Sequence, residues 1–301
     1  MKVIGQYRNN DYACIMLSDG TKIRYNNLDS FHPEKPESID LKITNKCFGN
    51  GNGLCSMCHE NSTPNGKHGD ILNLPFLDTM LPYSEVAVGG GNVLLHPKLI
   101  SFLHSLKERK LIANMTVNQT DFMQNSIFLK YLADSKLIYG LGVSLTDASD
   151  EFIKTVKKFP NAVIHVINGL VTMDELKRLA DNNLKILILG YKEFRRGKVL
   201  YDAIGQDIEN KKSELYEALP EIVNDGWFDC VSFDNLAVEQ LVPKRVMTDE
   251  EYDLFYMGND GEFTMYVDAV ERKFAKSSTS TERWDITDDI KDMFDRVRGV
   301  A

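Results

Sequence analysis

The chain has 301 residues and carries 44 acidic against 35 basic side chains, which gives a net charge of −9. A hydrophobic fraction of 43% is enough for a buried core and excludes a globally disordered chain. The acidic balance disfavours an extended nucleic-acid interface, since phosphate contacts need clustered lysine and arginine. No run of about eighteen apolar residues is present, so we expect no membrane span.

The cysteine content bears on the cellular compartment. Of the five cysteines, three lie within residues 47–58, without the pattern of a disulfide framework. Segment 1–8 lacks the long apolar core and the cleavage site of a signal peptide. We therefore expect a reduced, cytoplasmic protein.

Residues 2–27 predict a small β element. Two apolar, alternating runs flank Asn9 and Asn10, and a turn signal at 18–21 precedes a third run. The proline-containing segment 31–36 is typical of a linker. We expect residues 1–36 to form a first unit.

From Ser38 onward, strand and helix patterns alternate. Short aliphatic runs predict strands at 39–44, 85–89, 113–118, 140–144, 162–167 and 185–189, with a seventh candidate at 230–233. Apolar stripes predict helices around 99–106, 128–132, 152–159 and 173–180, the last opened by an N-cap pair of Thr172 and Glu175. Repeated β–α units predict a parallel sheet with right-handed crossovers. The expected fold class is α/β, a partial TIM-like (β/α)6 barrel over residues 37–241.

Beyond Pro243 the alternation stops. Residues 253–257 and 263–268 flank a Gly-Asn-Asp-Gly sequence, which predicts a β-hairpin. A Ser/Thr-rich segment at 277–281 and a helix at 288–297 follow. We expect residues 242–301 to cap the barrel.

The most informative stretch follows the strand at 39–44. Cys47 is separated by a seven-residue Gly/Asn loop from Cys55 and Cys58. Clustered thiolates bind zinc or iron–sulfur clusters. A zinc site would need a fourth ligand such as His59 or His68, whereas three cysteines can hold a [4Fe–4S] cluster and leave one iron open.

A glycine-rich turn follows the strand at 85–89. Gly89, Gly90 and Gly91 precede Asn92 at the point where a helix pattern begins. Such glycines can serve a strand-to-helix turn or let the backbone approach a ligand closely. A phosphate cradle is a further option, but the Gly-Lys-Ser/Thr continuation of a P-loop is missing.

Together these motifs resemble those of the radical S-adenosylmethionine superfamily. The family motif C-x3-C-x2-C is lengthened here to C-x7-C-x2-C, and Gly89–Pro97 resembles the family's G-G-G-E-P-L-L motif with Asn92 in place of Glu. The resemblance covers roughly residues 38–234. Within the family, the sequence is similar to small members from bacteria and their phages. It implies a radical SAM-type barrel in which Cys47, Cys55 and Cys58 ligate the cluster.

The resemblance also implies a site for S-adenosylmethionine at the strand ends. The amine and carboxylate of that cofactor would chelate the open iron, and the Met57 backbone would contact adenine. Asn118 and Ser144 occupy positions that often bind ribose and carboxylate, while His165 either contacts adenine or is a core histidine. The residues implied are Met57, Gly89, Gly90, Gly91, Asn92, Asn118, Ser144, His165 and Leu189.

The implied activity is that of an enzyme. Reductive cleavage of S-adenosylmethionine would give a 5′-deoxyadenosyl radical, which abstracts hydrogen from a small molecule, a nucleotide or a peptide residue. An electron donor such as a flavodoxin or ferredoxin would be a partner. The alternative is a non-enzymatic, zinc-stabilised binding protein on a barrel scaffold.

Two loops near the predicted site have open roles. Residues 48–54 are expected to fold over the outer side of the cluster, where a reductant or substrate must approach. The basic loop containing Lys192, Arg195, Arg196 and Lys198 is either a solvated loop or a subsite for an anionic substrate group.

Overall fold

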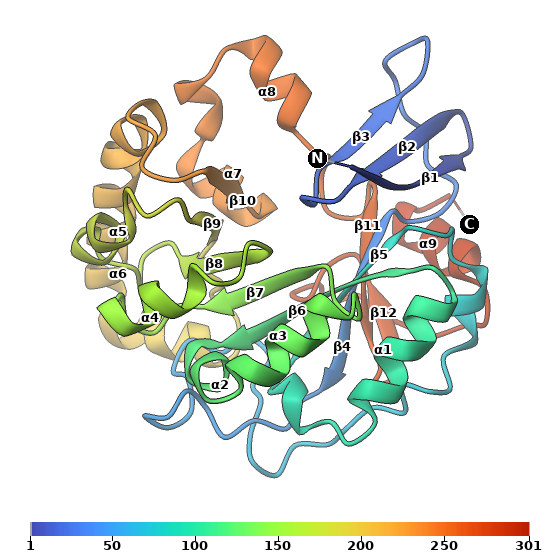
Figure 1. Ribbon diagram of the computed structural model, residues 1–301, viewed down its shortest axis with the longest axis horizontal. Coiled ribbons are helices and arrows are strands. Elements are labelled where there is room, and N and C mark those ends of the chain that lie inside the picture. The colour runs from blue at the N-terminus through green and yellow to red at the C-terminus, as the bar shows by residue number, and fades with distance from the viewer. Residues whose placement is uncertain (1, 301) are drawn as a thin grey trace.

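The computed structural model describes residues 2–300, and a large open sheet dominates it (Figure 1). Met1 and Ala301, the outer ends of the first and third expected units, lie outside the described residues. The strands of the main sheet are β4 (Ser38–Thr44), β5 (Glu85–Gly90), β6 (Ile112–Asn118), β7 (Gly140–Ser144), β8 (Ala162–Ile167), β9 (Lys185–Leu189), β10 (Cys230–Phe233), β11 (Thr264–Asp268), β12 (Lys273–Ala275) and β13 (Trp284–Asp285). All seven strands predicted from the sequence between residues 39 and 233 are confirmed.

The strand order shows that the main sheet is open, as in a partial barrel. Strands follow one another as β10-β9-β8-β7-β6-β5-β4-β11-β12-β13, so the sheet has two edges and does not close. Pairing is parallel from β10 through β4 to β11, and antiparallel for β12 and β13. The α/β class and the parallel run of strands are confirmed. A helix that crosses over between two strands returns the chain to the end at which the first strand began, so the second strand runs parallel to the first.

Helices lie between the strands of the main sheet, and a last helix follows β13. They are α1 (Leu99–Glu108), α2 (Gln119–Gln124), α3 (Ser126–Asp134), α4 (Asp150–Val156), α5 (Met173–Leu179), α6 (Arg196–Asn224), α7 (Asn235–Leu241), α8 (Asp249–Phe255) and α9 (Ile290–Arg298), with short 3-10 helices η1 (Pro75–Thr79), η2 (Val93–Leu95) and η3 (Pro243–Val246). The predicted N-cap pair is present as a full capping box, since Thr172 and Glu175 exchange hydrogen bonds at the start of α5.

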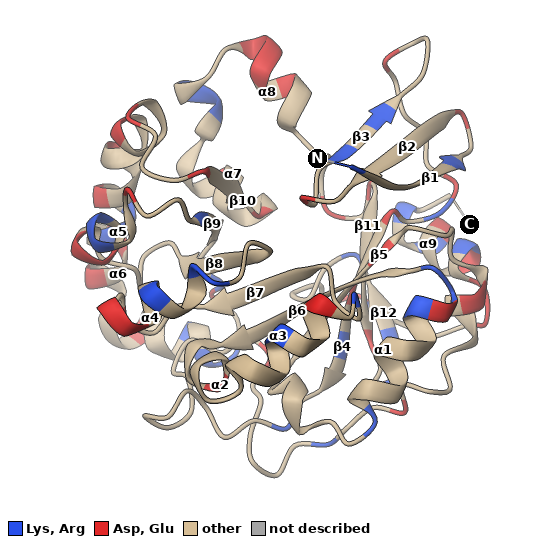
Figure 2. Cartoon of the chain, in the orientation of Figure 1, with Lys and Arg blue, Asp and Glu red and all other residues tan. Residues whose placement is uncertain are grey.

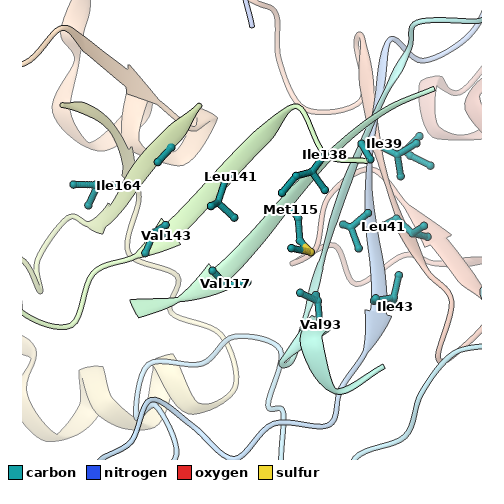
Figure 3. Packing of buried hydrophobic residues seen from close by; sticks show 14 of the residues in the cluster. Ile39, Leu41, Ile43, Val93, Met115, Val117, Ile138, Leu141, Val143 and Ile164 are labelled. Atoms are coloured by element: carbon teal, nitrogen blue, oxygen red, sulfur yellow. The ribbon is translucent and has the colours of Figure 1, made fainter. Parts of the chain in front are cut away.

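The core lies between the sheet and the helices on its outer face. Leu41, Met115 and Val143 come from three strands and point to the same side of the sheet (Figure 3). They pack in one cluster with Phe102 and Leu106 of α1. Because side chains alternate along a strand, the neighbouring residues must point to the opposite face.

That opposite, inner face is polar and partly open to solvent. Asn114, Thr116 and Asn118 of β6 are half-buried there, and Asp40 of β4 is exposed. The inner face is therefore the surface on which a ligand can be held.

A separate three-stranded sheet confirms the predicted N-terminal β element. Its antiparallel strands are β1 (Val3–Asn9), β2 (Tyr12–Leu17) and β3 (Lys22–Tyr25). It is tied to the start of β4 through the buried Glu37, which accepts from Arg24 at 2.7 Å and from the Tyr12 hydroxyl at 2.6 Å. Burial by itself raises the pKa of Glu37, but the nearby cations lower it overall, so the carboxylate keeps its charge.

The C-terminal hairpin lies further along the chain than predicted. Residues 253–257, expected to be a strand, instead include the end of α8, whose first turn carries three acidic residues (Figure 2). A capping box between Thr248 and Glu251 starts this helix, and that signal outweighs the Gly-Asn-Asp-Gly turn after it. The hairpin is formed by β11 with β12, and β11 also extends the main sheet beside β4.

Within residues 2–300, no helix combines the length and the apolar character needed to cross a membrane.

Candidate functional site

The cysteine loop begins and ends beside strand β4. After β4 the chain passes through Cys47, and the returning segment is hydrogen-bonded to it: the Cys47 N–H donates to Thr63 O at 2.9 Å. The Thr63 N–H donates in turn to Asn45 O at 3.0 Å. Because the loop is closed in this way, Cys55 and Cys58 are brought back towards Cys47.

The three thiols interact with one another. Burial raises the pKa of both Cys47 and Cys55, and repulsion from Cys58 adds to the rise. The Arg196 charge opposes this rise in pKa at both thiols and so lies close enough to act on the two sulfurs. The Gly49 N–H also donates to Cys47 Sγ at 3.2 Å. Half-buried thiols of this kind ionise when a metal takes the place of the proton.

The geometry of the loop does not preform a site for a single ion. No three His, Cys, Asp or Glu side chains in the described chain, 2–300, converge closely enough to hold one metal ion. His68, a candidate fourth zinc ligand, instead contacts Thr44 Oγ1 through Nδ1 at 2.9 Å and packs edge-on against His96. A four-iron cluster makes a different demand, since each thiolate binds its own iron.

The glycine turn after β5 is held against the start of the cysteine loop. The Gly91 N–H donates to Thr44 O at 2.7 Å, and the Asn92 N–H donates to Lys46 O at 2.8 Å. Gly90 has a φ of +117°, and a Cβ on it would lie 2.3 Å from Thr44 O. Only glycine fits this close approach, so the turn that follows β5 and the loop that follows β4 form one unit.

A carboxylate that the sequence did not single out lies beside this unit. Asn92 Nδ2 donates to Asp121 Oδ2 at 2.7 Å, and Asn118 Nδ2 donates to the same oxygen. The side-chain oxygens of Asn92 and Asn118 are used locally, accepting from the N–H groups of Leu94 and Asp121. Asp121 also raises the pKa of Cys47, which places its charge near the thiols.

Three of the predicted side chains form a row across the inner face. Register pairs Asn118 with Ser144, and Ser144 with His165, so these residues are neighbours on β6, β7 and β8. The His165 ring lies over Gly142, where a Cβ would come within 2.4 Å of its Cε1 atom. Burial lowers the pKa of His165 to about 4, so the imidazole is neutral at physiological pH. His165 is half-buried on the open face and does not belong to the apolar core.

Met57 lies in the cysteine loop, and Leu189 lies at the end of β9. The Met57 carbonyl faces the first turn of α6, where a Cβ on Gly197 would lie 3.3 Å from it. Leu189 is half-buried on the inner face and pairs with Ile167 of the neighbouring strand. Both positions are compatible with the predicted contacts, which stay predictions.

The loop 48–54 is attached to the start of α2. Thr120 Oγ1 donates to Asn50 O at 2.5 Å, and Asn118 Nδ2 lies 3.4 Å from Gly49 O. The first half of the excursion is thereby held against the end of β6. This contact keeps the loop near the thiols, as its predicted role requires.

The basic loop after β9 binds the far end of the cysteine loop. Arg195 Nη1 donates to Glu60 O and Arg196 Nη2 donates to Ser62 O, both at 3.0 Å. Arg196 Nε is buried and has no partner among the described residues. Arg195 and Arg196 therefore position the cysteine loop, while Lys198 forms an exposed pair with Asp202.

A buried ion network adjoins the site. Lys42, which is 4% exposed on β4, lies 2.8 Å from Glu60 and 3.1 Å from Asp268 of β11. The Tyr266 hydroxyl donates to Glu60 at 3.0 Å. Burial raises the pKa of Glu60, but the neighbouring His59 and Lys42, together with the hydrogen bonds from Lys42 and Tyr266, lower it overall. Neither Lys42 nor Asp268 was singled out from the sequence, since they are separated by more than two hundred residues.

The residues present fit a three-cysteine cluster with a bound zwitterion. The Gly49 N–H and the Arg196 charge both favour ionised sulfur, and thiolate ligation requires it. The Asp121 carboxylate lies near the same thiols and can accept from an ammonium group. The half-buried row on β6, β7 and β8 offers an amide, a hydroxyl and an imidazole to the rest of a ligand.

Comparison with known proteins supports the fold. No family model and no curated protein matches the chain. Among solved structures, SuiB from Streptococcus suis bound to S-adenosylmethionine is similar, with a TM-score of 0.59 and 13% identity over 89% of this chain and 68% of SuiB. SuiB bound to the precursor peptide SuiA gives a TM-score of 0.57 and 14% identity over 89% of this chain and 67% of SuiB.

This likeness establishes a class of architecture and nothing finer. The chain has a mixed α/β fold with a large parallel sheet of the kind found in SuiB. At 13–14% identity, the shared fold does not carry ligands or activity from one protein to the other.

Proposed function

We propose that this protein is a radical S-adenosylmethionine enzyme. The observation that carries the proposal is the joining of two motifs: the three-cysteine loop after β4 and the glycine turn after β5 are hydrogen-bonded to each other at adjacent strand ends. Adjacent carboxyl ends of parallel strands are where ligands bind in such folds. The SuiB structure with a similar fold contains S-adenosylmethionine.

In this proposal Cys47, Cys55 and Cys58 hold a [4Fe–4S] cluster. When bound, the cluster and S-adenosylmethionine supply reductive cleavage of a sulfur–carbon bond, which yields a 5′-deoxyadenosyl radical that abstracts hydrogen. The protein binds, orients and shields these groups. Arg196 and the Gly49 N–H stabilise the negative charge of the sulfurs.

Asp121 takes the role of the missing motif glutamate. Its carboxylate, fixed by the amides of Asn92 and Asn118, accepts from the ammonium group of the cofactor. Ser144 and neutral His165 contact the nucleoside, with Leu189 and the Met57 backbone against adenine. Gly89, Gly90 and Gly91 let the backbone approach closely.

The remaining assignments are part of the same proposal. Residues 37–241 form the catalytic unit, residues 1–36 a flanking β unit, and residues 242–301 a C-terminal unit whose strand β11 extends the main sheet beside β4. The protein acts in the cytoplasm with a flavodoxin- or ferredoxin-type electron donor. The substrate is a small molecule, a nucleotide or a peptide residue, and a similar SuiB structure holds a precursor peptide.

The test is anaerobic purification followed by incubation with S-adenosylmethionine and dithionite. We expect a coloured protein with about four irons per chain, as a [4Fe–4S] cluster requires, and 5′-deoxyadenosine as a product. A colourless protein with one zinc would instead support the zinc-stabilised binding protein. An intact cluster that yields no 5′-deoxyadenosine, with any candidate substrate, would show that the cofactor is used in another way.

A further inference from the structure

A cavity of about 370 Å³ opens beside the cysteine loop. Asn45, two residues before Cys47, and Asn61, three residues after Cys58, both line it. The rest of the wall is formed by charged side chains from β4, the cysteine loop, the loop after β9, β12 and the segment before β13: Lys42, Glu60, Arg195, Lys273 and Arg283. Five separate parts of the chain thus bring charge to one small space.

The charges of the buried network beside this cavity are balanced, since Lys42 and Arg283 lie beside Glu60 and Asp268. Lys273 pairs with Asp285 at 2.8 Å. At the rim, the exposed Arg195 and Glu271 carry opposite charges, and water screens both. The site therefore depends on the free donors of its guanidinium groups.

Two guanidinium groups in this wall have donors to spare. Arg283 donates through Nε to Ser280 O and through Nη2 to Ser278 O, while its Nη1 lies 3.8 Å from Asp268. Arg195 makes a single side-chain hydrogen bond within residues 2–300, from Nη1 to Glu60 O. Paired guanidinium groups match the geometry of carboxylate and phosphate oxygens.

The position of Arg283 is itself fixed. Its guanidinium lies 5.2 Å from the centre of the Tyr266 ring, and Tyr266 donates to Glu60 on the opposite side. The carbonyls of Ser278 and Ser280 accept from the same guanidinium group. An arginine fixed by neighbours loses little freedom on binding a ligand, which is the arrangement of a preformed site.

We propose that this cavity binds an oxyanion group of the substrate, a carboxylate or a phosphate, between Arg195 and Arg283. The ligand accepts from the guanidinium donors that the two arginines leave free. The anion site itself stands without the cluster, whereas its role as the anchor of the substrate rests on the proposed function. Because the cavity adjoins the cysteine loop, an anchored substrate lies with the rest of its body towards the inner face.

The test is calorimetric titration of the full-length protein with inorganic phosphate and, separately, with succinate, before and after cluster loading. We expect saturable binding of at least one anion to the wild type. Arg283→Gln and Arg195→Gln should each weaken it at least tenfold, and Arg283→Lys should weaken it less. Lys198→Gln, in the same basic loop but paired with Asp202 away from the cavity, is the matched control and should bind as the wild type.

The outcomes separate the two proposals. Wild-type protein that binds neither anion, or both glutamine variants binding as tightly as the wild type, overturns the oxyanion site. Circular dichroism and urea unfolding of each variant show whether lost binding comes from lost folding, and Arg195→Gln, on an exposed loop, keeps the test valid if Arg283→Gln unfolds. Anion binding by a protein that assembles no cluster overturns the proposed enzyme and leaves the anion site standing.

Discussion

The side-chain amide of Asn92 donates to the carboxylate of Asp121 across 2.7 Å. Asn92 stands where a glutamate would complete the glycine-rich motif, and the structure shows that its amide supports a carboxylate supplied by the next strand-to-helix junction. Asn118 contributes a second amide to the same oxygen. The negative charge missing from the motif is therefore present at the site, on a different element.

Asp121→Asn should weaken the binding of S-adenosylmethionine. A hydrogen bond between charged groups contributes about 1.5–3 kcal/mol, so the dissociation constant should rise by roughly tenfold or more. Equilibrium dialysis with cluster-loaded, unreduced enzyme measures this without turnover.

The matched control for Asp121→Asn is Asp150→Asn at the start of α4. That carboxylate is 96% exposed in a surface pair with Arg178, and its loss should leave binding unchanged. Equal dissociation constants for Asp121→Asn and the wild type would show that Asp121 does not hold the cofactor.

Cys55→Ala should abolish the cluster. Three thiolates hold three irons, and two are too few to keep it, so iron content and the visible absorption band should both fall to background. Cys230→Ala removes an exposed cysteine outside the loop and should keep the wild-type iron content. Iron retained in full by Cys55→Ala would contradict the ligand assignment.

Arg196→Gln should make the cluster harder to reduce. The guanidinium charge lies near two of the sulfurs, and removing it destabilises the more negative, reduced state. We expect a fall in reduction potential on the order of 60 mV, which is a tenfold change for a one-electron couple. Redox titration followed by electron paramagnetic resonance measures it.

Lys198→Gln provides the comparison for Arg196→Gln, since Lys198 lies two residues further along α6 and pairs with Asp202 at the surface. Its reduction potential should match that of the wild type. If Arg196→Gln has the same reduction potential as the wild type and Lys198→Gln, the guanidinium group does not influence the cluster.

Gly142→Ala should destabilise the fold through His165. The added methyl group would overlap the imidazole, and such overpacking costs about 1–3 kcal/mol. In a His165→Ala background the same substitution should cost less, because the clashing ring is gone. Urea unfolding of the four proteins gives the coupling, and a cost that is the same in both backgrounds would rule out this contact.

Asp40→Asn should change how stability depends on pH. The Asp40 side chain still reaches solvent, but desolvation by the surrounding protein raises its pKa to about 6. The ionised form is therefore disfavoured in the folded state, and stability is lost as pH rises from about 4 to 6. The asparagine variant lacks this loss and should be more stable than the wild type at pH 7.5. Because the side chain reaches solvent, the gain is about 1 kcal/mol after allowance for screening.

The stability of Asp40→Asn and of the wild type is compared by urea unfolding at two pH values. Below about pH 4 both carry a neutral group at this position, and the difference between them should shrink. A difference that is the same at pH 4 and pH 7.5 would show that the Asp40 carboxyl titrates normally.

Local patterns in the sequence predicted most of the elements. Alternation and β-branched residues located seven strands of the parallel run, and Thr172 with Glu175 located the start of α5. These signals are short-range, since each depends on residues within one element. The strand expected at 253–257 was wrong because a second capping box, at Thr248 and Glu251, begins a helix there.

The sequence by itself determined the motifs: three thiols on one loop, a glycine turn after the next strand, and the order of strands and helices between them. Only the tertiary structure decided that the sheet stays open, that the Asn92 amide donates to Asp121, and that Lys42 pairs with Asp268. The reason is physical. Periodicity and capping act over a few residues, whereas a charge finds its partner through the packing of distant strands, which no local pattern encodes.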